Sequence, residues 1–274
     1  MNIADTLFSG KKTLVMGIVN ATGDSFSEGS SSAAATAVDR ALALLDDGAD
    51  MLDIGGESTR PGAAVVPEKE ECQRVIPVIR ELKRLRPECI ISIDTRKSEV
   101  AKAALDAGAD VLNDVSMLRF DEKMTEVAAA SQAPLILAHS RGTPENMRQL
   151  CDYNGNVTDA VLAELLAARD RAAAAGVKQI ILDPNFGFAK TAEQDWELLR
   201  NIGTFCGYGT VLAGISRKSF LGALSGEEIP EKRLGSTIAA ALFLADHGMR
   251  ILRVHDVRQV RYALQAHFYL EVKR

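Results

Sequence analysis

Short apolar runs alternate with longer helical segments along the whole chain, and this alternation limits the folds open to it. Each run is continuous rather than alternating and is rich in Ile, Val and Leu, as in strands buried on both faces of a parallel sheet. The runs are Leu14–Val19, Met51–Ile54, Ile90–Ile93, Val111–Leu112, Leu135–Ala138, Ile180–Leu182, Val211–Ile215 and Ile251–Val254. They predict an α/β fold with eight parallel strands.

The segments between the runs have the period of amphipathic helices. Ala33–Asp47 places Val38, Leu42 and Leu45 on one face. The same pattern recurs in Glu68–Leu85, Ser98–Ala107, Thr158–Ala175 and Leu234–His247. Several of these helices end in a glycine just before the next run, namely Gly48, Gly108, Gly176 and Gly248. Glycine there permits the left-handed backbone that turns a helix into a strand, so we expect a repeated strand–helix unit.

Two architectures fit eight such units. A doubly wound open sheet usually carries a glycine-rich phosphate turn after its first strand, whereas Asn20–Asp24 has no GxGxxG pattern. A (β/α)₈ TIM barrel needs about 250 residues, which nearly uses up the 274 of this chain. We therefore predict one barrel domain over residues 1–274, with its active site at the C-terminal ends of the strands.

Composition excludes several classes of partner. The net charge of −5 gives no reason to expect nucleic acid or an anionic membrane, and no apolar run has membrane-spanning length. The N-terminus lacks an apolar signal core, so we expect a cytoplasmic protein. Cys72, Cys89, Cys151 and Cys206 have no metal-ligand spacing and are expected to be free thiols.

Polar residues follow the apolar runs with regularity. They are Asn20, Asp53, Asp94, Asn113, His139, Asp183, Ser216–Lys218 and His255. A single Asp or Asn after a strand is often only a helix cap, and Asp94–Lys97 fits that interpretation too. In a barrel, however, all eight strand ends meet at one mouth, where catalytic groups lie.

Two loops and three cationic residues are further candidates for ligand binding at this mouth. Gly55–Gly62 is a glycine- and proline-rich loop, and Asn20–Gly29 is a polar loop whose Phe26 is either a lid over a flat ligand or a buried anchor. The cations are Arg60, Arg253 and His255, which together fit a diphosphate, although each arginine could instead make a surface salt bridge. The amide oxygen of Asn20 suits Mg²⁺, which keeps several waters and bridges phosphate oxygens.

The chain resembles the dihydropteroate synthase family over nearly its whole length. The motifs that carry the resemblance are GIVNATGDSFSEG, GGESTRPG, SIDTRK, NDVS, HSRGTPENM, DPNFGF, SRKSFLG and RVHDV, in the family's order and spacing. The resemblance implies a transferase of folate biosynthesis, a target of sulfonamides. Such an enzyme joins 6-hydroxymethyl-7,8-dihydropterin diphosphate to p-aminobenzoate and releases diphosphate.

The resemblance also implies roles for particular residues. Asp94, Asn113, Asp183 and Lys218 would hold the pterin, while Asn20, Arg60, Arg253 and His255 would meet the Mg²⁺–diphosphate. Phe26, Thr59, Pro61, Phe188 and Ser216 would line the p-aminobenzoate pocket. Asp94, Lys218, Arg60 and Thr59 are the expected catalytic residues, and a homodimer is implied by the resemblance alone.

The implied mechanism is dissociative. The C–O bond to diphosphate breaks first, Mg²⁺ and the cations stabilise the departing charge, and Asp94 stabilises the pterin cation. The neutral aniline nitrogen then attacks, and no dedicated general base is required. Accordingly, the chain shows no Ser-His-Asp or Cys-His arrangement.

The chain departs from the family pattern at four places. Gly23 replaces a usual proline, and Ser30 a common glycine. Ala138 and Ser140 stand where methionines are common, and Asn185–Phe186 where glycine and a small aliphatic residue are usual. Because Asn tolerates a left-handed backbone, we expect the turn at Asn185 to survive.

Three other functions compete with the synthase. A corrinoid-linked methyltransferase that binds methyltetrahydrofolate would keep the pterin-binding residues, but it has no use for a diphosphate cluster. A Schiff-base aldolase would need Lys218 desolvated as its nucleophile. A barrel that only binds pterins would not need Asn20, Arg253 and His255. The phosphate-facing residues favour the synthase over all three.

Overall fold

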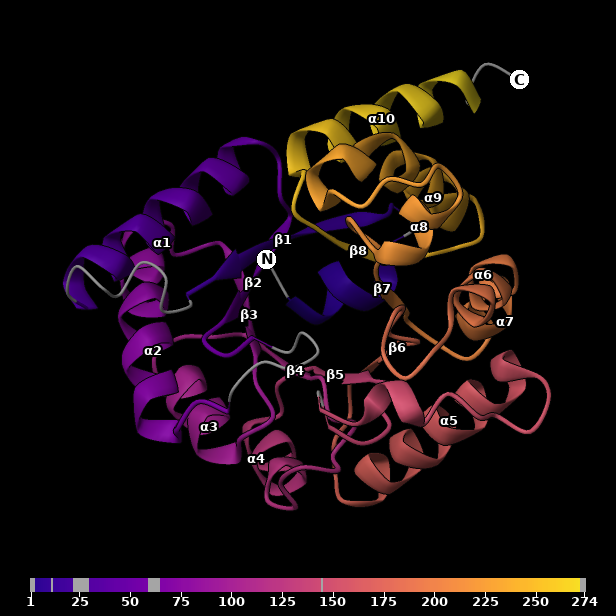
Figure 1. The fold of residues 1–274 in the computed structure, drawn as a ribbon. Coiled ribbons are helices and arrows are strands. Elements are labelled where there is room, and N and C mark those ends of the chain that lie inside the picture. Colours follow the sequence, from indigo (N-terminus) through magenta and orange to yellow (C-terminus); the bar gives the residue numbers. More distant parts are fainter. Residues whose placement is uncertain (1–2, 11, 22–29, 59–64, 144, 272–274) are drawn as a thin grey trace.

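The strands form a single closed ring. The computed structural model describes residues 3–10, 12–21, 30–58, 65–143 and 145–271. Eight parallel strands pair in the order β6-β5-β4-β3-β2-β1-β8-β7, and a parallel bridge from Leu182 to Val211 joins β6 to the start of β7. Helices surround the ring (Figure 1). The chain is therefore a (β/α)₈ barrel, and the open-sheet alternative is excluded.

The observed strands match the eight apolar runs. They are β1 Leu14–Asn20, β2 Met51–Gly55, β3 Ile90–Asp94, β4 Val111–Asp114, β5 Leu135–Ala138, β6 Ile180–Asp183, β7 Leu212–Gly214 and β8 Ile251–Val254. Several run one or two residues beyond the apolar run into a polar residue or glycine, because backbone pairing continues regardless of the side chain. These added residues include Asn20, Asp94, Asn113 and Asp183, so the candidate site residues belong to the rigid barrel.

The helices include all five that the periodicity predicts, with ends within about three residues. The α-helices are α1 Ser30–Asp46, α2 Glu68–Leu85, α3 Ser98–Asp106, α4 Met124–Ser131, α5 Val157–Ala174, α6 Ala192–Arg200, α7 Ile202–Cys206, α8 Ser219–Ala223, α9 Leu234–Asp246 and α10 Val257–Glu271. Shorter pieces are η1 Asp5–Ser9, η3 Met147–Gln149 and η4 Pro230–Arg233. The four glycines predicted to end helices all have φ between 87° and 113°, as a left-handed turn requires.

The core has two parts. The larger part lies between the strands and the surrounding helices. The smaller part fills one end of the barrel interior and consists of Leu7, Leu14, Met16, Met51, Ile90, Val111, Ile136, Ile181, Leu212 and Ile251. Leu7 belongs to η1, the short indigo helix that lies across the ring of strands in Figure 1. The N-terminal segment therefore closes this end of the barrel with apolar side chains.

Candidate active site

A polar layer lies in the barrel above the apolar plug. Successive residues of a strand face opposite sides, so the side chain two positions after an inward residue also faces inward. Counting two residues on from Met51, Val111, Ile181 and Ile251 leads to Asp53, Asn113, Asp183 and Arg253, and four from Ile90 leads to Asp94. We call Asp53, Asp94, Asn113, Asp183 and Arg253 the polar layer. The alternation of the strands thus places apolar side chains at the closed end and ionisable ones at the mouth.

Arg253 links two buried carboxylates at the centre of this layer. Its Nε donates to Asp53 Oδ2 at 2.6 Å, and its Nη2 donates to Asp94 Oδ2 at 2.7 Å. Burial disfavours a charge on the guanidinium, but Asp53 and Asp94 together raise the pKa of Arg253 above its usual value. Arg253 therefore bridges two acids of the polar layer, with 22% of its side chain exposed at the mouth, and is not on the outer surface of the barrel.

Asp53 is the member of the polar layer for which the sequence pattern predicts no role. Its side chain is fully buried, and its Oδ2 accepts from Asn113 Nδ2 at 3.1 Å as well as from Arg253. The alternation of inward and outward side chains along β2 could have predicted this position, because Asp53 follows the inward-facing Met51 by two residues. A buried carboxylate at that spacing must face the interior.

Asp94 is not a helix cap. Helix α3 begins at Ser98, its N-cap is Lys97, and the side chain that accepts from the Ser98 amide is that of Asp121, at 2.8 Å. Burial raises the pKa of Asp94 to about 7, with Arg253 opposing the shift. Asp94 therefore lies beside a cation in a desolvated site, and it is anionic above about pH 7.

Asp183 and Lys218 face each other across the other half of the mouth. Asp183 accepts from the Asn185 amide at 2.7 Å, and burial raises its pKa to about 6. Burial also lowers the pKa of Lys218 to about 8, with Asp183 opposing the shift. Lys218 Nζ donates to Phe186 O at 2.5 Å and lies 4.7 Å from the centre of the Phe188 ring.

Three buried oxygens of the barrel interior have no hydrogen-bond partner among the described residues. They are Asp53 Oδ1, Ser92 Oγ and Asn113 Oδ1. A buried polar atom without a partner costs about 1–3 kcal/mol, and such atoms are rare in folded proteins. The polar layer therefore offers acceptors that a ligand with several N–H donors would satisfy.

The rim residues of the predicted diphosphate and p-aminobenzoate sites are only partly brought together. Ser216 Oγ lies 3.0 Å from His255 Nδ1 and accepts from the His255 amide at 3.2 Å. Asn20 is exposed at the end of β1, next to Gly55 of β2. Arg217 does not join the site, because it is paired with Asp256 at 2.7 Å. Phe26, Thr59, Arg60 and Pro61 lie outside the described residues.

Glu57 joins two of the sequence motifs. Its Oε2 accepts from the Val66 amide at 2.8 Å and from Lys97 Nζ at 2.6 Å, and its Oε1 accepts from Arg96 Nε at 2.9 Å. The pKa of Glu57 is lowered because these bonds outweigh its burial. Arg96 and Lys97 therefore hold the β2 loop through Glu57.

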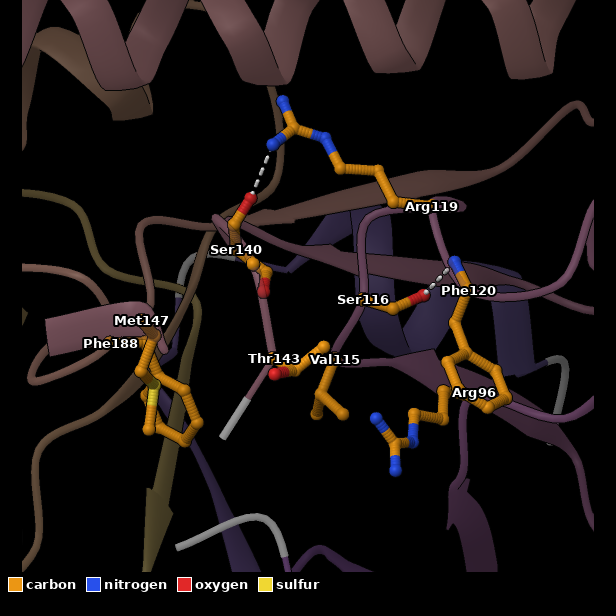
Figure 2. Close-up of a pocket in the computed structure, with 10 residues that line it drawn as sticks. Arg96, Val115, Ser116, Arg119, Phe120, Ser140, Thr143, Met147 and Phe188 are labelled. Carbon is orange, nitrogen blue, oxygen red and sulfur yellow. Dashed lines mark hydrogen bonds between the residues drawn. The ribbon is translucent and has the colours of Figure 1, made fainter. Parts of the chain in front are cut away.

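The departures in the fifth and sixth strand ends have visible consequences. Asn185 has φ of 55°, which confirms that its turn survives, and its Nδ2 donates to His139 O at 3.1 Å. Ser140 lines a cavity beside the polar layer, together with Val115, Phe188 and others shown in Figure 2. None of the acids of the polar layer lines this cavity, so we regard it as a side extension of the mouth.

The described residues contain no group of three or more His, Cys, Asp or Glu side chains that could hold a metal. No helix in the described part of the chain is long and apolar enough to cross a membrane. The four cysteines are free, as predicted.

Comparison with known proteins matches these features to one family. Residues 16–255 match the family described as pterin binding enzyme. A dihydropteroate synthase of Synechocystis sp. is 45% identical over 93% of this chain and 89% of its own length. A structure of Xanthomonas albilineans dihydropteroate synthase with 4-aminobenzoic acid is 40% identical, with a TM-score of 0.88 over 95% of this chain and 93% of that one. Another from that organism, in complex with 7,8-dihydropteroate, is 36% identical, with a TM-score of 0.85 over 97% and 98% of the two chains. This chain belongs to the pterin binding enzyme family, among the dihydropteroate synthases.

Proposed function

We propose that the chain condenses 6-hydroxymethyl-7,8-dihydropterin diphosphate with p-aminobenzoate to give 7,8-dihydropteroate and diphosphate. The observation that carries this proposal is the buried polar layer, in which Asp94, Asn113 and Asp183 lie at the ends of β3, β4 and β6 above an apolar plug. A pterin presents an edge of adjacent N–H donors and acceptors on a flat ring. Carboxylates and an amide pair with such an edge, and the unpartnered Asn113 Oδ1 is one acceptor for it.

Asp94 supports the chemical step by its charge, and Lys218 is the other described residue that we assign to catalysis. When the C–O bond breaks, its electron pair leaves with the diphosphate and a cation spreads into the pterin ring. A carboxylate in a desolvated site stabilises that cation far more than it would in water. The aniline nitrogen then forms the C–N bond and loses its proton to the departing phosphate or to water. Catalysis therefore needs charge placement rather than a nucleophilic side chain.

The p-aminobenzoate pocket is proposed beside Lys218 at the mouth, because the Phe188 ring centre lies 4.7 Å from Lys218 Nζ. Phe188 and Ser216 are its described members, and Phe26, Thr59 and Pro61 are assigned to it from the sequence alone. Ser216 contacts His255, which we propose to meet the diphosphate together with Asn20, Arg60 and Arg253. The homodimer that the resemblance implies, and the cytoplasmic location expected from the N-terminal sequence, remain proposals as well.

The residues present fit a magnesium ion carried mainly by the substrate. Asn20 offers one neutral oxygen at an exposed strand end, and the described residues have no carboxylate cluster to hold a metal by themselves. Mg²⁺ is commonly bound by one or two protein oxygens together with phosphates and water. When bound, it would neutralise charge on the leaving diphosphate.

The alternative functions are less well supported. The described relatives are dihydropteroate synthases, which does not favour the corrinoid-linked methyltransferase. Lys218 is desolvated, as an aldolase would require, but it bonds to Phe186 O and lies beside Asp183. Borohydride trapping with an aldehyde substrate tests the aldolase directly, and labelled Lys218 would contradict our assignment.

The experiment that tests the proposal is direct. Purified protein is incubated with the pterin diphosphate, p-aminobenzoate and Mg²⁺, and dihydropteroate and diphosphate are followed by chromatography. We expect both products in equal amounts. Absence of dihydropteroate, with the protein folded by circular dichroism, would reject the function.

The pH dependence of the reaction follows from the buried acids and Lys218. Asp94 and Asp183 must be anionic, and burial raises their pKa values to about 7 and about 6. Lys218 must be protonated, and burial lowers its pKa to about 8. We therefore expect kcat/KM to peak between pH 7 and 8, to fall about tenfold per pH unit between pH 7 and 6, and to fall about a hundredfold per pH unit below pH 6. In Asp183→Asn the fall in kcat/KM near pH 6 should disappear. A pH profile identical to that of the parent protein would contradict the assignment of this fall to Asp183.

Metal dependence is expected as well. Excess chelator should lower the rate by at least about a hundredfold, because the leaving diphosphate loses its counter-charge. Added Mg²⁺ should restore the rate, and Asn20→Ala should raise the Mg²⁺ concentration needed for half-maximal rate. Full activity in chelator would exclude the metal.

A further inference from the structure

Lys190 is a buried lysine at the mouth of the barrel to which the proposed reaction gives no part. Its side chain is 9% exposed, and its Nζ has three partners: Phe188 O at 2.9 Å, Asn185 O at 3.1 Å and His139 Nδ1 at 3.1 Å. Burial lowers the pKa of Lys190 to about 7, with Asp195 and Asp183 opposing the shift, and in its protonated form the amine has three N–H donors. All three are therefore used within the protein, and none is left for a substrate.

The loop that Lys190 contacts has an unusual backbone. Between Asp183 and Lys190 the residues Asn185, Gly187 and Ala189 have φ of 55°, 82° and 51°. Alternate left-handed residues prevent a regular hydrogen-bond pattern, so the carbonyls and amides of the loop need other partners. The conformation of this loop therefore depends on the side chains that surround it.

Those side chains come from several elements. Lys218 Nζ donates to Phe186 O, and the Tyr153 hydroxyl donates to Ala189 O at 2.8 Å. Asp195 accepts from the Gly187 amide at 2.8 Å. Lys190 is the group that bonds to Phe188 O, next to the one aromatic ring that faces Lys218.

His139 fixes the orientation of Lys190. The imidazole is fully buried, and its Nε2 lies 3.3 Å from Glu164 Oε2. Glu164 is held in turn by Arg119 and Arg141. Burial lowers the pKa of His139 to about 3, so the ring is neutral. With Nε2 facing a carboxylate, the proton lies on Nε2 and the Nδ1 lone pair accepts from Lys190.

We propose that Lys190 is a positioning residue for the p-aminobenzoate site, which holds the Phe188 ring in place by bonding to the carbonyls on both sides of the turn. The centre of that ring lies 4.7 Å from Lys218 Nζ. This inference rests on the proposed function, because it assigns Phe188 to p-aminobenzoate. Without Lys190, Phe188 O and His139 Nδ1 lose their donor, and Asn185 O keeps only the Phe188 amide at 3.3 Å, so the turn must rearrange to satisfy the freed acceptors.

The test compares three variants by steady-state kinetics. Lys190→Met keeps the length of the side chain and removes its donors. We expect KM for p-aminobenzoate to rise at least about tenfold and KM for the pterin diphosphate to change less than about threefold. Lys178→Met is the matched control, because Lys178 is exposed just before β6. Asn185→Gly removes the side-chain bond to His139 O but keeps the carbonyl that Lys190 binds, and both KM values should change little.

The single tryptophan gives a second readout. Trp196 packs edge-on against Phe220 at 5.0 Å between ring centres, and Phe220 stacks on Phe186 of the loop. The emission of Trp196 should therefore shift in Lys190→Met and stay unchanged in Lys178→Met. If Lys190→Met does not fold, Lys190→Gln carries the same test, with a several-fold rise in KM for p-aminobenzoate expected because one amide cannot replace three donors.

The outcomes are distinct. Unchanged KM values, or two KM values that rise together with a lower melting temperature, would overturn the positioning role. If the unmodified protein makes no dihydropteroate, the proposed function fails by itself. In that case Trp196 emission decides the role of Lys190 in the loop: a shift supports it, and an unchanged spectrum rejects it.

Discussion

Replacing Asp94 with alanine should lower kcat by about 10²–10³-fold, or about 3–4 kcal/mol of transition-state stabilisation. The reason is the position of the carboxylate. It lies buried in the polar layer, where an anion next to a developing pterin cation is not screened by water. Initial rates at saturating concentrations of both substrates give the effect on kcat directly.

The matched variant is Asp94→Asn, which keeps the shape and removes the charge. We expect it to lose nearly as much activity as Asp94→Ala, while both melt close to the parent because Arg253 still pairs with Asp53. In Asp94→Asn the acid limb near pH 7 should also vanish. Parental kcat in either variant would exclude the charge-stabilising role.

Replacing Arg253 with methionine should destabilise the fold by about 3–5 kcal/mol and abolish turnover. The variant leaves Asp53 and Asp94 together in the barrel without the cation that both contact, and an uncompensated buried charge is costly. One carboxyl is then expected to take up a proton at neutral pH. Chemical denaturation measures the free energy of unfolding. The decrease in this free energy from the parent to the variant should be smaller at pH 5 than at pH 8.

A double variant separates stability from function. Asp53→Asn combined with Arg253→Met removes one of the two acids and should recover part of the lost stability but none of the activity. Equal stability of the single and double variants would contradict the bridging role of Arg253. Recovery of turnover would contradict the assignment of Arg253 to the diphosphate.

Much of the barrel could be predicted from sequence because its signals are local. Continuous apolar runs and helical periods are read within a few residues of each other, and each predicted strand is present. The helices that the periodicity missed were α4, α6, α7, α8 and α10. Helix α4 has only 8 residues, and α7 and α8 have 5 each, too few for a clear period.

The candidate site was harder, because its contacts join distant parts of the chain. The order of the strand ends predicted Asp94, Asn113, Asp183 and Lys218 at one mouth. It did not predict that Arg253 bonds to Asp53, which is 200 residues away, rather than standing free at the rim. Likewise, the lysine of the DTRK motif binds Glu57, and nothing in the spacing indicates that pairing. Partner choice among charged residues is a tertiary property.

The N-terminal plug determines by which end of the barrel ligands can enter and leave the enzyme. Apolar side chains, with Leu7 among them, fill the far end of the barrel, so that end offers no passage. Everything that enters or leaves must therefore use the mouth. In the proposed arrangement, a pterin on the polar layer would lie deeper than p-aminobenzoate beside Phe188 and Ser216, so we expect the pterin to bind first. The joined product would then have to leave through the same mouth before the next cycle begins.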